Sequence, residues 1–144
     1  MQEYILMSIK TKYANQIFEG AKLYEYRRKS IGSKNIGKII FIYSSEDARQ
    51  IIGYITIDSI IEGNLDYVLD YTNNKDNLDI IKYFNNASRC YALKIDKVYK
   101  FNNPITLEEI KKLDNKFVIP QYYRYLKEDE VMYNILKDLL DKEN

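Results

Sequence analysis

The 144-residue chain contains no histidine and only one cysteine, Cys90. These absences exclude a Ser-His-Asp triad, a Cys-His dyad, a zinc-binding H-E-x-x-H helix and any structural zinc site built from Cys and His. A single cysteine cannot form a disulfide within the chain, which fits a reducing compartment. Any catalysis must therefore use Lys, Ser, Thr, Tyr or a carboxylate.

Several sequence signatures are also missing. The chain has neither a G-x-x-x-x-G-K-[ST] phosphate loop nor a G-x-G-x-x-G turn. Its acidic residues form no calcium-loop pattern, so we expect no metal and no cofactor. No apolar run approaches the roughly 18 residues that a membrane span requires, and the start MQEYILMSIK lacks the basic region of a secretory leader. We therefore expect a cytoplasmic protein without membrane contact.

The overall charge is nearly balanced. The 22 Lys and Arg residues face 21 Asp and Glu residues, a net charge of +1, so any basic surface must be local. A hydrophobic fraction of 46% over this length predicts one domain, residues 1–144, with a single core. The fifteen tyrosines suit base stacking, but an AT-rich coding sequence would also produce them, since Asn, Lys and Ile are abundant and Trp is absent.

Hydrophobic periodicity predicts short strands and helices. Strands are expected at residues 4–9, 23–28, 38–43, 50–61 and 89–101. Helices are expected at residues 12–19, twice between 65 and 84, from the capping box of Thr106 and Glu109, and at about 128–141. Gly53 indicates a bulge or bend. Because helices do not follow every strand, the pattern predicts an α+β fold with a small, curved mixed sheet or barrel of five to six strands.

The chemistry concentrates between Gly20 and Lys38. Glu25 and Arg27 lie two apart on a predicted strand, so both side chains leave the same face, and Lys22 precedes them in a turn. Positive charge continues without an intervening acid through Arg28, Lys29, Lys34 and Lys38. Phosphate contacts need such a local concentration of cations. The alternative is an exposed edge strand protected by charge, with Glu25 and Arg27 as a surface ion pair.

These residues also carry a family resemblance. Gly20, Lys22, Glu25 and Arg27 match G-x-K-x-x-E-x-R, and with the opening of the chain they resemble the start of ASCH domains in the PUA-like superfamily. The segment PQYYRYL, residues 120–126, looks like a region near the C-terminus of some bacterial and phage members. The resemblance implies a PUA-like β-barrel whose cleft is lined by this motif. It further implies recognition of RNA or a nucleobase, with a role in RNA processing or transcriptional regulation.

The resemblance leaves catalysis open. Some small members are amidohydrolases on N4-acetylated cytidine that use a Thr nucleophile, a Lys and a Glu; here Lys22 matches the lysine, but Glu25 stands at the threonine position. The catalytic glutamate falls in the region of the inserted helices, where Glu62, Asp66 and Asp70 are open alternatives. A carboxylate beside Lys22 favours its charged form, so the pair suits binding better than attack. Lys22 and Glu25 are the catalytic candidates for an amidohydrolase or ribonuclease, and a protein-interaction domain is a third reading.

We predict one ligand-binding cleft, with RNA or a nucleoside as the partner. Its expected residues are Lys22, Glu25, Arg27, Arg28, Tyr24, Tyr26 and Ser44. Lys22 and Arg27 would contact the ligand, while Glu25 orients Arg27 and accepts a hydrogen bond from a base amino group. The tyrosines either stack on a base or pack in the core. Ser44 either forms a wall of the site or caps the following turn.

Overall fold

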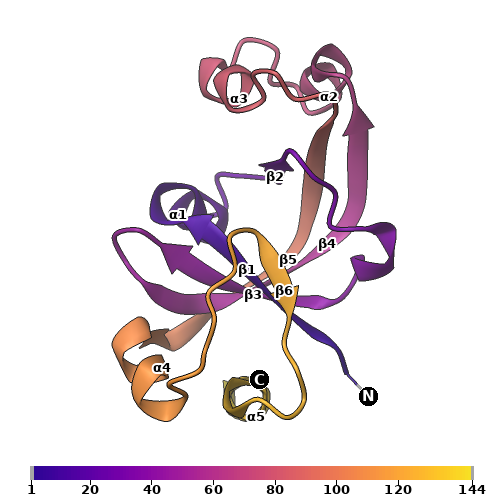
Figure 1. Cartoon of the computed structure of the whole chain (residues 1–144). Helices are drawn as coiled ribbons and strands as arrows, with labels where there is room; N and C mark the ends of the chain where they lie inside the picture. The colour runs from indigo at the N-terminus through magenta and orange to yellow at the C-terminus, as the bar shows by residue number, and fades with distance from the viewer. Residues whose placement is uncertain (1, 144) are drawn as a thin grey trace.

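The computed structural model describes residues 2–143 and forms one six-stranded mixed sheet (Figure 1). The strands are β1 (Tyr4–Lys10), β2 (Tyr24–Arg27), β3 (Ile39–Ser45), β4 (Gln50–Gly63), β5 (Cys90–Thr106) and β6 (Tyr123–Tyr125). Their order is β2-β5-β4-β3-β1-β6, with β1 parallel to β3 and the other neighbours antiparallel. The sheet is curled into a half-barrel, as the predicted α+β class with a small mixed barrel requires.

Five α-helices and one short 3-10 helix accompany the described strands. They are α1 (Thr11–Phe18), η1 (Ser33–Asn35), α2 (Leu65–Tyr71), α3 (Leu78–Tyr83), α4 (Leu107–Leu113) and α5 (Val131–Glu143). The long strands β4 and β5 run away from β1, β3 and β6 and carry α2 and α3 at their far end (Figure 1). None of the helices within residues 2–143 is both long and apolar enough to cross a membrane.

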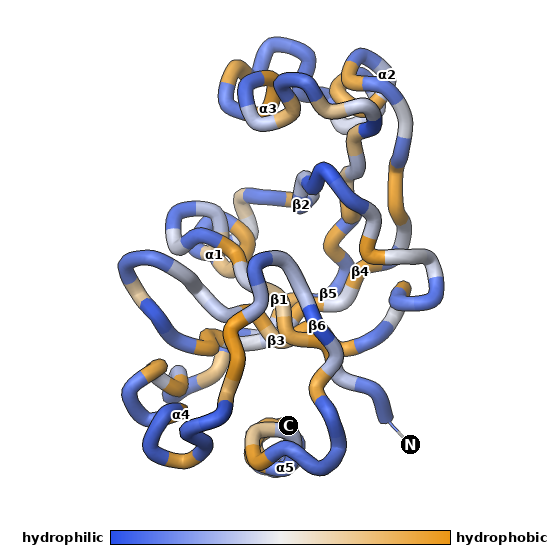
Figure 2. Tube along the Cα trace, in the orientation of Figure 1, coloured by the Kyte–Doolittle hydropathy of each residue, from blue (hydrophilic) through white to orange (hydrophobic). Residues whose placement is uncertain are grey.

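Alternation along the central strands divides the core between the two faces of the sheet. Leu6 and Phe41 pack with α4 and α5 on one face, while Met7 and Ile42 pack with α1 on the other. The apolar residues gather along β1 and β3 in the middle of the molecule (Figure 2). Because β3 is covered on both sides, its uninterrupted apolar run is fully explained by burial.

The predicted bulge at Gly53 is confirmed. The register of β4 shifts there against both β3 and β5. A Cβ atom on Gly53 would overlap the carbonyl oxygen of Tyr99 and lie 2.8 Å from the ring of Phe18. Glycine therefore allows the close approach that bends the sheet.

The C-terminal part departs most from the predicted elements. The strand β6 was not expected, and α5 begins at Val131 instead of about residue 128. Glu130 explains the later start, because its carboxylate accepts hydrogen bonds from the side chain of Arg124 and the backbone N–H of Lys127. Residues 127–130 are thereby held in a turn before the helix.

The predicted capping box at Thr106 is confirmed.

Candidate ligand-binding pocket

Gly20 follows the end of α1 and positions the first residues of the site. Gly20 has φ of +80°, a left-handed conformation that glycine adopts without steric cost. The backbone N–H groups of Gly20 and Ala21 then donate to the carbonyls of Ile17 and Gln16 at the end of α1. This turn reverses the chain, so that Lys22 leads directly into the edge strand β2.

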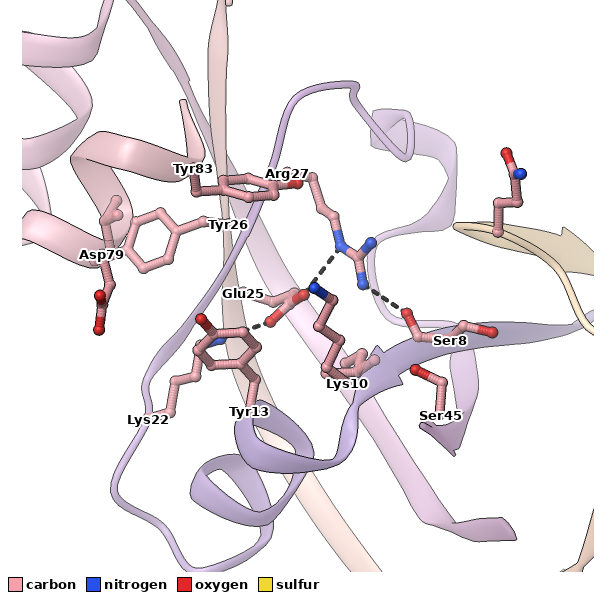
Figure 3. Close-up of a pocket in the computed structure, with 13 residues that line it drawn as sticks. Ser8, Lys10, Tyr13, Lys22, Glu25, Tyr26, Arg27, Ser45, Asp79 and Tyr83 are labelled. Carbon is pink, nitrogen blue, oxygen red and sulfur yellow. Dashed lines mark hydrogen bonds and ion pairs between the residues drawn. The ribbon is translucent and has the colours of Figure 1, made fainter. Parts of the chain in front are cut away.

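Glu25 lies at the centre of the site, buried between two cations (Figure 3). Its Oε1 accepts a hydrogen bond of 2.8 Å from Lys22 Nζ. Its Oε2 lies 2.9 Å from Arg27 Nε, at an angle that makes the contact an ion pair without a formal hydrogen bond. Only 6% of the Glu25 side chain is exposed, which excludes the alternative of an ordinary surface ion pair.

Both cations also rest on aromatic rings. Lys22 Nζ lies 4.7 Å from the ring centroid of Tyr13, and Arg27 Cζ lies 4.5 Å from that of Tyr122. Arg27 Nη2 donates to the carbonyl of Ser8 at 2.7 Å, which ties β2 to β1. Burial raises the pKa of the Tyr122 phenol well above its ordinary value, although the charge of Arg27 opposes the shift. The hydroxyl of Tyr122 is buried and has no hydrogen-bond partner within residues 2–143.

These groups open into a cavity of about 260 Å³. This volume lies just below the range of roughly 300 to 1,000 Å³ typical of small-molecule sites, so it suits a single base-sized group. The polar and aromatic residues of its lining are Ser8, Lys10, Tyr13, Lys22, Glu25, Tyr26, Arg27, Ser45, Asp79, Tyr83 and Gln121. Asp79 and Tyr83 reach the cavity from α3, opposite Lys10 and Tyr13 (Figure 3). The helical insertion therefore supplies one wall.

Arg28 does not line this cavity. Its Nη1 donates two hydrogen bonds of 2.9 Å to the backbone carbonyls of Tyr83 and Asn85. The strand β2 turns the Arg28 side chain away from Glu25 and Arg27 toward the end of α3. Arg28 therefore links the end of α3 to the segment after β2 and does not itself line the pocket.

The other expected site residues are divided between the pocket and its surroundings. Tyr26 lines the pocket but is also core, since it packs edge-on against Phe84 and its hydroxyl accepts from Asn74. Tyr24 lies outside the pocket, in an adjoining cavity. Ser44 is fully buried and donates to the hydroxyl of Thr11, so it forms no wall; its neighbour Ser45 does.

The remaining acids and cations of the predicted site lie elsewhere. Glu62 pairs with Arg89, Asp70 pairs with Lys75, and Asp66 is also absent from the lining. Lys38 pairs with Glu3 at 2.6 Å, and both Lys34 and Lys38 lie over the ring of Tyr125. Lys34 and Lys38 therefore lie beside β6 and outside the lining of the pocket.

Sequence reasoning missed Asp79, Tyr83, Ser8 and Lys10. Asp79 and Tyr83 are some fifty residues from the motif and carry no local signal of their own. Lys10 ends β1, where the strand passes into α1, so its position beside the motif follows only from the pairing of strands.

Comparisons with known proteins support the fold. The sequence model of the family described as ASCH domain matches residues 7–137. An ASCH domain-containing ribonuclease from Zymomonas mobilis is 23% identical over 128 residues, which cover 87% of this chain and 85% of the relative.

Solved structures agree in fold. The crystal structure of ASCH from Zymomonas mobilis has a TM-score of 0.77 at 20% identity, covering 92% of this chain and 94% of the other. A serine-to-alanine variant of the same protein has a TM-score of 0.78 at 19% identity, covering 94% and 96%. The N-terminal domain of Staphylothermus marinus McrB has a TM-score of 0.57 at 13% identity, covering 94% and 93%.

Proposed function

Because the chain belongs to the ASCH domain family, we propose that it binds RNA or a nucleobase in the pocket lined by Lys22, Glu25 and Arg27. The observation that carries this proposal is the buried carboxylate of Glu25, held between two cations at the wall of a cavity. Burying three ionic groups costs desolvation energy that packing alone does not require. A ligand with both hydrogen-bond donors and acceptors would bind to these charged groups and offset that energy.

The hydrogen-bond donors of Arg27 and acceptors of Glu25 that the protein leaves unused match the edge of a base. Arg27 uses Nε and Nη2 within the protein, which leaves the N–H groups of Nη1 for a phosphate or a base acceptor. Each oxygen of Glu25 has a second lone pair, which can accept from an exocyclic amine such as that of cytosine. Tyr83, 41% exposed at the opposite wall, offers a ring for stacking.

Binding titrations with nucleosides and single-stranded RNA test this proposal. Arg27→Ala should weaken binding of every ligand at least about tenfold, whereas Glu25→Gln should change the preference among bases more than the overall affinity. Tyr83→Ala should also weaken binding about tenfold, since stacking contributes roughly 1–3 kcal/mol per base. Because Tyr83 is 41% exposed, we expect its variant to keep the fold. The matched control is Arg89→Ala, whose side chain pairs only with the exposed Glu62 among the described residues.

Equal affinity of the wild type, Arg27→Ala and Tyr83→Ala for all these ligands would refute the proposal. Loss of affinity with Arg27→Ala alone would point to misfolding, and thermal melts of the same samples identify that case.

Salt dependence measures how many phosphates are contacted. A track that used all five cations Arg27, Arg28, Lys29, Lys34 and Lys38 would give a slope of log K against log salt of about −3.5, at about −0.7 per contact. Contacts by Lys22 and Arg27 alone would give about −1.4. Since Lys22 and Arg27 line the pocket and Arg28, Lys29, Lys34 and Lys38 do not, we expect the smaller slope.

A second candidate function is RNA cleavage, favoured by the name of the Zymomonas mobilis relative. RNA cleavage needs no nucleophile from the protein when the neighbouring 2′-hydroxyl attacks the phosphate, because this transesterification forms a 2′,3′-cyclic phosphate and breaks the bond to the 5′-oxygen of the next nucleotide, which leaves as a hydroxyl. The protein must instead stabilise the developing charge and transfer protons. Lys10, Lys22 and Arg27 are placed for the first task, and Glu25 and Asp79 are the carboxylates in the lining.

Incubation with labelled single-stranded RNA tests this activity. Cleavage should be lost in Lys22→Ala and kept in Arg89→Ala. The amidohydrolase alternative has less support, because Glu25 holds the threonine position and no threonine is among the described residues of the lining. Turnover of N4-acetylcytidine, lost in Lys22→Ala, would favour it over RNA cleavage.

A further inference from the structure

We propose that a second nucleotide subsite adjoins the pocket, so that the ligand is a dinucleotide step of single-stranded RNA. This inference rests on the proposed function and specifies its substrate. The subsite is a cavity of about 450 Å³ between α1, the segment 21–24 and the loop between α2 and α3.

The two cavities adjoin one another. They share the lining residues Tyr13, Lys22, Tyr26, Asp79 and Ile80. The ammonium of Lys22 therefore stands at the boundary between them. The proposal is that a ligand whose first base fills the first cavity reaches past these shared side chains into the second.

Two cations lie near Tyr13, whose side chain lines both cavities. Lys22 Nζ and Lys12 Nζ lie 4.7 and 5.8 Å from the ring centroid of Tyr13. Asp79 is the only acid among the described residues that line the second cavity. The phosphodiester that joins two nucleotides is the part of the ligand that needs cations, and this boundary places it between the two bases.

Carboxamides dominate the rest of the second cavity, which is lined by Gln16, Asn73, Asn74 and Asn77. Asn and Gln side chains present a donor and an acceptor together, as the edge of a base does. Asn74 and Asn77 have structural roles, since Asn74 donates to the Tyr26 hydroxyl and Asn77 caps α3. Within residues 2–143, the side chains of Gln16 and Lys12 make no hydrogen bond or ion pair, so both are available to a ligand.

Affinities for matched ligands of one and two nucleotides test the subsite. The probes are the four 5′-nucleoside monophosphates and 5′-phosphorylated dinucleotides with a 2′-deoxyribose at the linkage, which prevents cleavage. The wild type should bind the best dinucleotide at least about tenfold more tightly than the corresponding monophosphate. The double variant Lys12→Ala with Gln16→Ala should lose this difference while binding the unphosphorylated nucleoside as the wild type does, because a nucleoside has no phosphate for Lys12 to contact. The control is Asn15→Ala, an exposed position of the same helix outside both cavities.

Each outcome is decisive. If the wild type binds monophosphate and dinucleotide equally, the second subsite is refuted and the first pocket stands. If the dinucleotide advantage persists in the double variant, the second nucleotide lies elsewhere and the assignment is wrong. If neither probe binds the wild type, the proposed function fails and this inference fails with it.

Discussion

Replacing Glu25 with glutamine should lower the free energy of unfolding, because the Glu25 carboxylate neutralises the largely buried charges of Lys22 and Arg27. The variant keeps the shape of the side chain but leaves Lys22 and Arg27 without a counter-ion at side-chain exposures of 16% and 15%. Removing one partner of a buried ion pair costs roughly 3–5 kcal/mol. Since the glutamine oxygen still accepts one hydrogen bond and both cations keep some contact with water, we expect the lower end, about 3 kcal/mol. For a chain of this length, that loss lowers the melting temperature by roughly 6–12 °C.

Circular dichroism melts and urea titrations measure this loss. The control is Glu62→Gln, which removes an ion pair whose side chains are 55% and 56% exposed and should cost less than about 1 kcal/mol. Adding Lys22→Met to Glu25→Gln should restore part of the stability, because it removes one of the two unneutralised cations. If the melting temperatures of Glu25→Gln and the Glu62→Gln control agree within error, water screens the charges of Lys22, Glu25 and Arg27 and the reasoning is wrong.

Three further changes test other parts of the structure. Gly53→Ala should destabilise the protein by about 3 kcal/mol or lower its yield of folded protein, because the new Cβ overlaps the Tyr99 carbonyl; a melt close to that of the wild type would contradict this. Thr106→Ala should cost about 1 kcal/mol by urea titration through loss of the helix cap, and no change would show that the cap is dispensable. Burial raises the pKa of Glu130, but the hydrogen bonds from Arg124 and the Lys127 backbone outweigh it, and the pKa lies below its ordinary 4.5. The stability from this contact is therefore present above the ordinary pKa of 4.5 and lost as the pH falls through the lowered pKa. The free-energy gap between the wild type and Glu130→Gln should accordingly stay constant at neutral pH and shrink as the pH falls below about 4.5; a gap that stays constant in acid would refute the contact's contribution.

Local patterns predicted most of the elements because their causes are local. The apolar run of β3, the glycine at the bulge and the capping box at Thr106 each act within a few residues. The strand β6 has only three residues, too few for an alternating pattern, and it exists because β1 offers an edge for pairing. Its formation depends on tertiary structure, which a sequence window does not contain.

The candidate site also combines features that local spacing predicts with features that depend on the tertiary structure. The two-residue spacing of Glu25 and Arg27 placed both on one face, as the structure shows. The sequence predicts Ser44 in the site, at a strand end where a shift of one residue exchanges the buried and the pocket-facing side; in the structure Ser44 is buried and Ser45 lines the pocket. Asp79 and Tyr83 reach the pocket because α3 lies over β2. Arg28 supports this packing by donating to backbone carbonyls at the end of α3, and a contact to backbone atoms leaves no motif in the sequence.

The position of β1 between β3 and β6 also governs when the site can exist during synthesis. Its first neighbour, β3, leaves the ribosome soon after β1, but β6 and the contacts of Ser8 with Pro120 and Tyr122 come only with the last quarter of the chain. Until then, one edge of β1 is unpaired and Arg27 lacks the ring of Tyr122 on which it rests. A nascent chain that stops before this segment therefore has the motif but not the finished pocket. The proposed ligand binding would therefore depend on residues 120–125, the same segment that covers the exposed edge of β1.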